Sequence, residues 1–167
     1  MRRKNETEKK VIMAKLNIVL YCPEIPQNTG NISRTAAVTG AALHIIRPTG
    51  FEITDRNLKR AGLDYWDKLE IKYYDGSEDF LSKNEGGVMY YFTSHTEKPY
   101  TDVSYPEGVY LVFGRETSGL PSEITEANKH RCVRIPMRKT LRCLNLSNAV
   151  AIAVYEALRQ SGFEDLV

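Results

Sequence analysis

The sequence predicts an α/β domain, with a mostly parallel sheet flanked by helices, and three observations lead to this fold class. Short apolar runs alternate with patterns of helical period along the chain, which is typical of strand–helix–strand units. The strand-like runs are continuously apolar and rich in β-branched residues, as expected of strands that are buried on both faces. With 167 residues, of which 42% are hydrophobic and 26% are charged, the chain fits one globular domain.

The elements are expected in the following order. Strands are predicted at 16–21, 42–46, 69–73, 87–93, 108–113 and 132–135. Helices are predicted at 30–39, 55–61, 77–83 and 145–160, with a helical turn after Pro121. A single domain therefore covers 16–167. No apolar run approaches the ~20 residues that span a bilayer, so no membrane partner is expected.

Residues 1–15 form a separate segment with a net charge of +4. We expect a flexible basic tail, and RNA binding by this tail remains an alternative. The segment lacks the apolar stretch of a secretory signal. The three cysteines, Cys22, Cys132 and Cys143, include no CxxC pair and indicate neither a disulfide framework nor a zinc site. These features predict a cytoplasmic protein.

Several familiar sites are absent from the sequence. There is no GxGxxG, no GxxxxGK[ST] and no GxSxG, which argues against the usual dinucleotide, P-loop and hydrolase sites. His44, His95 and His130 lack metal-ligand spacing, so no metal is expected. His44 lies within a predicted strand and is expected to be packed or hydrogen-bonded, while His95 and His130 are expected on the surface.

Three unusual loops each follow a predicted strand, and ligands bind at the carboxyl ends of strands in open parallel sheets. The first loop is PEIPQNTGNISR, 23–34. Its density of polar groups exceeds what one helix cap needs. Arg34 is expected about one turn into the helix, an arrangement that suits a phosphate. A plain cap with a surface arginine is the alternative.

The other two loops also carry more polar residues than simple turns need. LVFGRETSGLP, 111–121, contains two glycines, which allow close approach of the backbone to a ligand. IPMRKTLRCLNLSNA, 135–149, brings a basic loop to the start of the last helix, at Asn145, Ser147 and Asn148. Capping alone would require only one of these three residues.

The net charge of +2 hides a local pattern. No acidic residue lies between Glu126 and Glu156, whereas a solvated surface normally mixes both signs. The same window contains six basic residues: Lys129, Arg131, Arg134, Arg138, Lys139 and Arg142. Such a patch beside a helix start indicates a polyanion contact, for which RNA is the natural candidate.

NTGNISR (28–34), FGRETSGLP (113–121) and IPM…RCLNLSNAV (135–150) resemble, in order and spacing, the three motifs of the SPOUT RNA methyltransferases. LNIVLYCPEIPQNTGNISR (16–34) and RAGLDYW (60–66) resemble the single-domain subgroup that methylates the 2'-hydroxyl of cytidine or uridine 34 in tRNA. The resemblance covers about 16–163. It implies an α/β fold with a deep C-terminal trefoil knot, and a homodimer that pairs near the first and last helices.

The resemblance also implies a cofactor, S-adenosylmethionine, bound in the knotted loops. Cys143 stands where the family usually has serine, which weakens cofactor binding only if the contact requires a hydroxyl. The cofactor contacts carried over to this sequence are Phe92, Thr93, Gly114, Ile135, Met137, Cys143 and Leu144.

The implied reaction is transfer of a methyl group to a ribose 2'-hydroxyl in a tRNA anticodon loop. Arg34 matches the arginine of the first motif, but a guanidinium is always protonated. We therefore expect Arg34 to hold an RNA phosphate and the hydroxyl. A phosphate oxygen or Asn145 would assist the departure of the proton, and Asn28 would orient the nucleotide. Glu116 would shape the second loop or touch the substrate. The expected RNA contacts are Arg115, Glu116, Arg131, Arg138, Lys139, Arg142 and Ser147.

Three alternatives stay open at this point. The chain could be a SPOUT 2'-O-methyltransferase acting on rRNA or on another tRNA position, although those relatives often carry extra RNA-binding domains. It could be a non-catalytic RNA-binding protein on the same fold, which the intact Arg34 argues against. It could also be an unrelated nucleotide-binding α/β enzyme, which the missing phosphate loops argue against.

Overall fold

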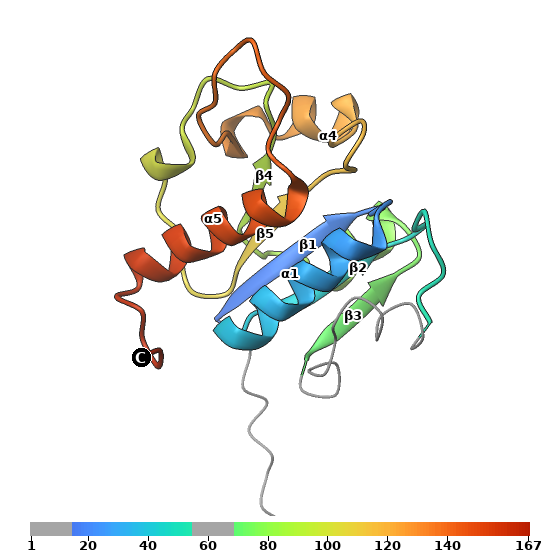
Figure 1. Cartoon of the computed structure of the whole chain (residues 1–167), viewed down its shortest axis with the longest axis horizontal. Helices are drawn as coiled ribbons and strands as arrows, with labels where there is room; N and C mark the ends of the chain where they lie inside the picture. Colours follow the sequence, from blue (N-terminus) through green and yellow to red (C-terminus); the bar gives the residue numbers. More distant parts are fainter. Residues whose placement is uncertain (1–14, 55–68) are drawn as a thin grey trace, which may run out of the picture.

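The computed structural model describes residues 15–54 and 69–167, and within them a six-stranded parallel sheet is flanked by helices (Figure 1). The strands are β1 (Leu16–Tyr21), β2 (Ala42–Ile46), β3 (Ile71–Tyr74), β4 (Met89–Phe92), β5 (Val109–Phe113) and β6 (Cys132–Val133). They lie in the order β3-β2-β1-β5-β4-β6, and every pairing is parallel. The predicted α/β fold with a mostly parallel sheet is therefore confirmed.

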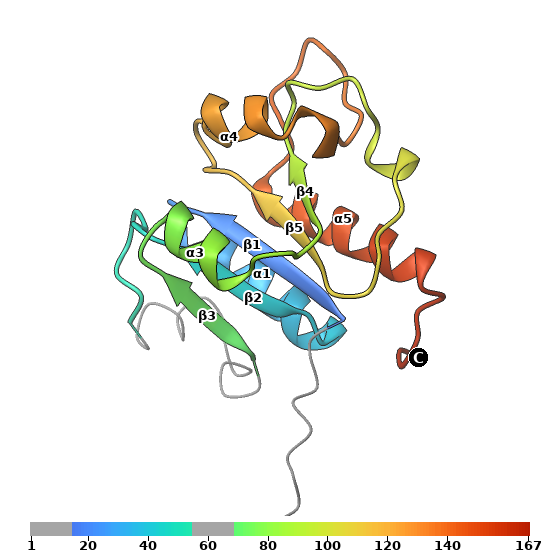
Figure 2. The same cartoon turned by 180° about the vertical axis from the view of Figure 1, so that it is seen from behind.

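Helices cover both faces of the sheet. Helices α1 (Pro26–Thr39) and α5 (Leu146–Gln160) lie on the face seen in Figure 1. Helices α3 (Ser77–Lys83) and α4 (Ser122–Ala127) lie on the face seen in Figure 2. Single 3₁₀ turns, η2 (Tyr100–Asp102) and η3 (Lys129–Arg131), complete the described elements. None of the helices in the described ranges is long and apolar enough to cross a membrane.

The strands have continuous apolar runs because the sheet is buried on both faces, as the sequence indicated. In β1, Ile18 and Leu20 pack with α1 and α5, whereas Val19 between them packs with the cluster on the α3 and α4 side. All three side chains are fully buried. Because successive side chains of a strand point to opposite faces, a sheet covered on both faces requires apolar residues at every position.

The predicted packing of His44 is confirmed. Its ring is fully buried in β2 and lies among the rings of Tyr74, Phe80 and Tyr110. The Tyr74 hydroxyl lies 2.7 Å from Nδ1, and Asn17 Oδ1 lies 3.0 Å from Nε2. Burial lowers the pKa of His44 from 6.5 to about 4, so the ring is neutral at pH 7. His95 and His130 are exposed, as expected.

Some predicted bounds hold and others need correction. The strands predicted at 69–73, 87–93 and 108–113 lie instead at Ile71–Tyr74, Met89–Phe92 and Val109–Phe113. Strands β1 and β2 and helix α3 have the predicted limits. Helix α1 begins at Pro26 instead of near residue 30, because proline suits the first helical position. Strand β6 ends at Val133 rather than at 135, because Arg134 pairs instead with the segment before η2. The helix predicted at 55–61 and the RAGLDYW motif lie outside the described residues.

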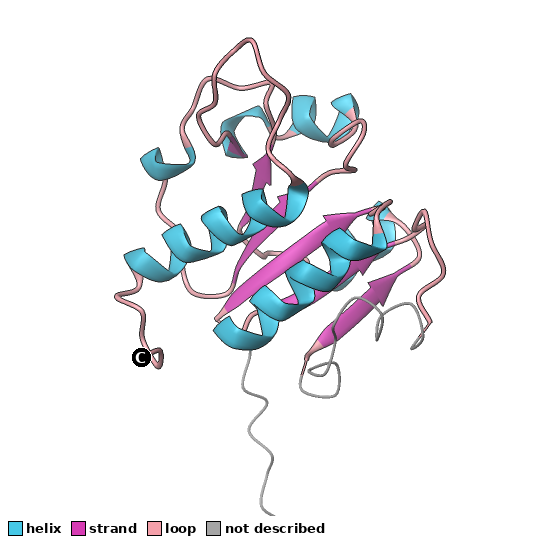
Figure 3. Cartoon of the chain, in the orientation of Figure 1, coloured by secondary structure: helices cyan, strands magenta, loops and turns pink. Residues whose placement is uncertain are grey.

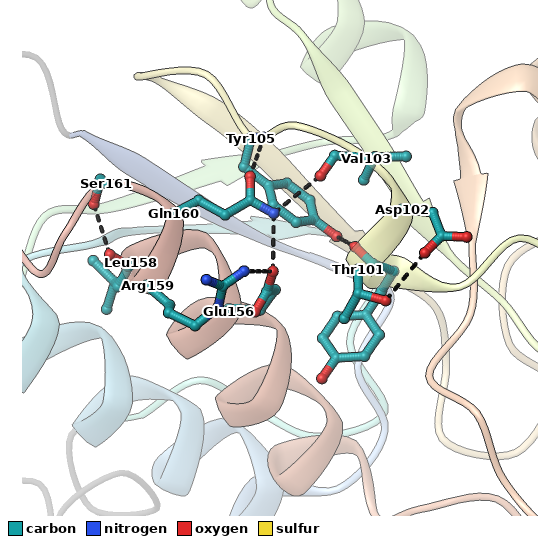
Figure 4. A network of polar contacts seen from close by, with 10 residues as sticks. Thr101, Asp102, Val103, Tyr105, Glu156, Leu158, Arg159, Gln160 and Ser161 are labelled. Atoms are coloured by element: carbon teal, nitrogen blue, oxygen red, sulfur yellow. Dashed lines mark hydrogen bonds and ion pairs between the residues drawn. The ribbon is translucent and has the colours of Figure 1, made fainter.

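A polar network holds the end of α5 against the chain that leads into β5 (Figure 4). Glu156 accepts two hydrogen bonds from the Arg159 guanidinium, at 2.8 and 2.9 Å. Gln160 donates to Glu156 at 2.9 Å and to the Val103 carbonyl at 3.0 Å, and it accepts from the Tyr105 amide. The last helix is therefore fixed relative to the segment that precedes the central strands.

The first described residue also belongs to this packed body. Lys15 Nζ lies 3.1 Å from Glu164 and 2.7 Å from Asp165, and the Lys15 carbonyl accepts from the Gly108 amide. Lys15, the last residue of the predicted tail, thus contacts the domain, while the flexibility expected of the tail falls on residues outside the described ranges.

Candidate functional site

The three unusual loops meet beyond the carboxyl ends of the central strands. The first follows β1, the second follows β5 at its neighbouring position in the sheet, and the third leads from β6 into α5. Figure 3 shows loop segments gathered beyond the ends of β4 and β5. The adjacency of β1 and β5, which are far apart in the sequence, brings the first two loops together.

Glu116 of the second loop binds the start of helix α1. Its carboxylate accepts from the amides of Glu24 and Ile25, at 2.8 and 3.1 Å, and from Asn28 Nδ2 at 3.2 Å. Helix α1 has no side-chain cap from its own N-cap residue, Ile25. The unpaired amides and positive end of a helix favour a carboxylate, so Glu116 acts as a cap from a remote part of the chain.

Glu24 completes a reciprocal clasp between the first two loops. Its Oε2 accepts from the Thr117 amide at 3.1 Å and from the Thr117 hydroxyl at 2.8 Å. These two hydrogen bonds lower the pKa of Glu24. Glu24 and Thr117 were not among the predicted site residues. The only signal for Glu24 in the sequence is a lone acid between the two prolines of the first loop.

Asn28 and Asn145 join the first loop to the third. Asn145 Nδ2 donates to Asn28 Oδ1 at 2.9 Å. Asn145 Oδ1 in turn accepts from the Ser147 amide at 2.9 Å and from the Ser147 hydroxyl at 2.6 Å, and so caps helix α5. A chain of hydrogen bonds therefore runs from Glu116 through Asn28 and Asn145 to Ser147, and it ties all three loops together.

This arrangement corrects the phosphate site expected at the start of the first helix. Since α1 begins at Pro26, Arg34 lies about two turns into the helix rather than one, at 3.6 residues per turn. The Glu116 carboxylate already occupies the amino end of α1. Arg34 is exposed, and it takes part in a further interaction. An RNA phosphate at Arg34 would therefore be bound by the side chain and not by the helix terminus.

A cavity of about 250 Å³ lies between the second loop, the third loop and the end of β4. Phe92 and Phe113, which both line it, stack on each other with ring centroids 4.7 Å apart. Apolar side chains and glycine backbone form most of the wall, which suits a flat ring such as adenine. All seven residues expected to contact the cofactor line this one cavity: Phe92, Thr93, Gly114, Ile135, Met137, Cys143 and Leu144.

Gly114 is required by the second loop itself. A Cβ atom at this position would lie 2.1 Å from the Gly119 carbonyl carbon and 2.2 Å from the Leu120 nitrogen. The loop closes there because Arg115 and Gly119 exchange backbone hydrogen bonds of 3.1 and 3.0 Å. Gly119 has a φ of +70°, which favours glycine. The glycines of this loop were predicted to let the backbone approach a ligand closely. At Gly114 the group that approaches closely is the backbone of the loop itself, at Gly119 and Leu120.

The basic window divides into two parts. Arg138, Lys139 and Arg142 are exposed on the third loop. Arg131 is half-buried, with its guanidinium over the Tyr90 ring and a 3.2 Å hydrogen bond to the Tyr90 hydroxyl.

The remaining two basic residues of the window also bind other groups of the protein. Lys129 pairs with Glu126 at 2.6 Å. Arg134 donates to the Thr96 carbonyl at 3.3 Å, and 19% of its side chain is exposed. Three of the six basic residues are therefore exposed, and they lie on the third loop beside the cavity. In the described parts of the chain, no group of three or more His, Cys, Asp or Glu side chains could hold a metal ion.

Comparison with known proteins gives one consistent result. The model of the SpoU rRNA Methylase family matches residues 15–155. A relative from Escherichia coli K12, named tRNA (cytidine(34)-2'-O)-methyltransferase, is 46% identical over 153 residues, which cover 91% of this chain and 98% of the relative.

Two solved structures extend the comparison. One, from work on 2-OH methylation of C/U34 on tRNA, superposes with a TM-score of 0.83 at 43% identity and covers 89% of this chain and 97% of the other. The other is an AdoMet-bound rRNA methyltransferase from Sinorhizobium meliloti, with a TM-score of 0.77 at 27% identity, covering 88% of this chain and 57% of the other. The match along most of the chain, together with the three joined loops, places this protein in the SpoU methylase family.

Proposed function

We propose that this protein transfers a methyl group from S-adenosylmethionine to the ribose 2'-hydroxyl of nucleotide 34, a cytidine or uridine, in tRNA. The observation that carries the proposal is the convergence of the three loops on one cavity, lined by all seven residues expected to hold the cofactor. The similarity to the E. coli enzyme, which spans 98% of that relative, supports tRNA nucleotide 34 as the target.

The cofactor is held by the cavity residues named above. S-adenosylmethionine would supply an electrophilic methyl group and leave as S-adenosylhomocysteine, and such an in-line displacement depends mainly on alignment of the reacting groups. The backbone at Gly114 and the apolar side chains of Ile135, Met137 and Leu144 bind and orient the adenosine part. Because Cys143 is exposed at the rim of the cavity, its replacement of the family's serine leaves this apolar wall intact.

The hydrogen-bonded asparagines have positioning roles. Both polar atoms of the Asn145 side chain are engaged, with Asn28 and with Ser147, and a neutral amide is not a base at any ordinary pH. The proton of the 2'-hydroxyl therefore leaves toward a phosphate oxygen of the RNA instead of toward Asn145. Arg34, always charged, binds that phosphate and the hydroxyl. Glu116 accepts three hydrogen bonds from the first loop, so we assign it mainly to shaping the site.

The exposed basic residues Arg138, Lys139 and Arg142 contact the anticodon loop. Arg115 and Ser147 lie nearer the reacting nucleotide. An anticodon loop suits such a small protein, because its bases are unpaired and can be read without opening a helix. Arg131 contributes less than predicted, since its guanidinium is engaged by Tyr90. Because its substrate is tRNA, we place the protein in the cytoplasm.

A trefoil knot and a homodimer complete the proposal. The Arg134 amide donates to the Lys98 carbonyl and the Arg134 carbonyl accepts from the Tyr100 amide, so the chain after β6 lies against the earlier segment before α5 returns to α1. This path supports threading of the third loop. Exposed apolar side chains at Val38 of α1 and at Ile152 and Tyr155 of α5 support pairing through these helices. The dimer doubles the small RNA surface.

Incubation with labelled S-adenosylmethionine and either total tRNA or ribosomal RNA tests the substrate class. We expect label in tRNA at the 2'-position of nucleotide 34. Label in ribosomal RNA alone would instead support the alternative substrate that the family's description names. Cofactor binding without transfer to either RNA would favour a non-catalytic RNA-binding protein.

A further inference from the structure

The tip of the second loop is held by a residue of the first loop. Residues 115–119 form a tight turn, which is closed by the two backbone hydrogen bonds between Arg115 and Gly119. Thr117 lies in the middle of this turn and is exposed. Its amide and its hydroxyl both donate to Glu24 Oε2, at 3.1 and 2.8 Å. One carboxylate oxygen of the first loop therefore binds both the backbone and the side chain at the tip of the turn.

The backbone of Glu24 is itself held by two other segments. The Glu24 amide donates to Glu116 Oε2 at 2.8 Å. Gly50, from the segment after β2, donates its amide to the Pro23 carbonyl at 2.9 Å. A Cβ atom at Gly50 would lie 2.9 Å from Glu24 Cα, so the two backbones approach closely. Because the backbone of the first loop is fixed independently of Thr117, Glu24 is the residue that positions and Thr117 is the residue that is positioned.

The turn that Glu24 holds is one wall of the cofactor cavity. Every residue from Gly114 to Leu120 lines this cavity, whereas Glu24 does not. Thr117 and Ser118, at the tip, are exposed. Segments with few buried contacts move most easily, so the hydrogen bonds to Glu24 limit how far this part of the wall moves.

Two properties of Glu24 could act on the turn, and they can be separated. The hydrogen bonds from Thr117 lower the pKa of Glu24, so the carboxylate is ionised at pH 7 and accepts as a charged group, which strengthens both bonds. Arg115 also interacts with Glu24 through charge alone. Replacement by glutamine removes the charge but keeps an acceptor oxygen, and it therefore distinguishes hydrogen bonding from charge.

We propose that Glu24 is a positioning residue for the cofactor, and that it acts through Thr117 to hold the cavity wall in the form that binds S-adenosylmethionine. The inference rests on the proposed function, from which it takes the cofactor, and adds to it a residue outside the cavity. A wall that is ordered in advance costs less to order when the ligand binds. The expected effect is therefore on cofactor affinity and not on methyl transfer at saturating cofactor.

Calorimetric titration with S-adenosylmethionine tests the proposal without requiring any reaction. Glu24→Ala keeps the backbone amide that binds Glu116 and loses only the bonds to Thr117. Its dissociation constant for the cofactor is expected to rise about tenfold, which corresponds to one or two hydrogen bonds of ordinary strength. At saturating cofactor, kcat on an anticodon stem-loop RNA should stay within about twofold of wild type. Glu24→Gln should recover most of the affinity, and a loss equal to that of Glu24→Ala would overturn positioning by hydrogen bonds.

Variants of Thr117 show whether the effect passes through this residue. Thr117→Ser keeps the hydroxyl and should bind the cofactor like wild type, whereas Thr117→Val loses the hydroxyl and should bind it more weakly. The double variant of Glu24→Ala with Thr117→Val should be no weaker than Glu24→Ala alone, because the two changes remove the same contact. Additive losses would mean that Thr117 contacts the cofactor independently of Glu24, and the proposal would be wrong.

Asp79→Ala is the matched control for a general loss of stability. Asp79 also accepts from a backbone amide, that of Asp75, at 3.1 Å, and it pairs with Lys83 at 2.7 Å on helix α3, away from the cavity lining. Both alanine variants are expected to unfold at a slightly lower urea concentration, but only Glu24→Ala should lose cofactor affinity. Equal affinity losses in both variants, or an unchanged affinity in Glu24→Ala, would overturn the proposal.

Failure of this inference is distinguishable from failure of the proposed function. If the wild-type protein binds S-adenosylmethionine but methylates no RNA, the proposed function fails and calorimetry still decides the role of Glu24. If Glu24→Ala binds the cofactor like wild type and both methylate nucleotide 34, the function stands and the inference fails. A wild-type protein that does not bind the cofactor would contradict both.

Discussion

At the scale of single residues, polar groups of the site are largely committed to one another before any substrate binds. Both polar atoms of the Asn28 and Asn145 side chains are used within the loops. Arg34 is exposed and does not line the cofactor cavity. We therefore assign the chemistry at the hydroxyl to Arg34 and the geometry of the site to the asparagines.

Arg34→Ala is expected to lower the rate of methyl transfer at least about 100-fold, the usual loss when a positioned catalytic group is removed. The dissociation constant of S-adenosylmethionine, measured by calorimetry, should stay within about twofold of wild type. Arg34→Lys keeps the charge and should recover part of the rate. Parallel loss of cofactor binding and activity in Arg34→Ala would contradict the role assigned to Arg34.

His44 makes folding stability depend on pH. Its pKa is about 4 in the folded protein and 6.5 when unfolded, so the unfolded state binds the proton more readily. The stabilisation is complete above pH 6.5 and is lost as pH falls toward 4, by about 3 kcal/mol in total. The free energy of unfolding is measured by urea titration at pH 7.5 and pH 4.5. Its difference between the two pH values should be smaller for His44→Gln than for the wild type. An equal pH effect in both proteins would rule out this source.

At the scale of elements, helix α1 depends on a residue 90 positions away for its cap. Local patterns predicted β1, β2 and α3 with the observed bounds, because their starts and stops lie in adjacent residues. The start of α1 was predicted four residues late. Pro26 is a local signal for the first helical position, but the Glu116 carboxylate that accepts from the Ile25 amide belongs to another loop. The inward position of Arg131 likewise depends on Tyr90, which no local pattern connects to it.

Glu116→Ala tests this remote cap. The variant loses three hydrogen bonds at the start of α1, and we expect the free energy of unfolding to fall by about 1–3 kcal/mol. Glu116→Gln keeps an acceptor oxygen and should lose less. Both values come from urea titration at pH 7. Unchanged stability in Glu116→Ala would show that the clasp contributes nothing to folding.

At the scale of the whole molecule, the sheet order explains why one cavity collects residues from four separate segments. β1, β5 and β4 are adjacent strands, so the loops that follow them share one edge, as the general rule for parallel sheets predicts. The seven residues that the family resemblance assigned to the cofactor all line this cavity, and their role in binding it stays a prediction. The rule and the motif spacing were not sufficient to identify the contacts between Glu24 and Thr117, which form only when β1 and β5 come together.

The central claim is that this assembled site methylates the ribose of one nucleotide. The most direct measurement incubates the protein and S-adenosylmethionine with two otherwise identical tRNAs, one with ribose and one with 2'-deoxyribose at cytidine 34, and maps the methyl group by mass spectrometry. We predict a single methyl group on cytidine 34 of the first tRNA and none on the second. Methylation of the deoxy tRNA, or of any other nucleotide in the first, would contradict the claim.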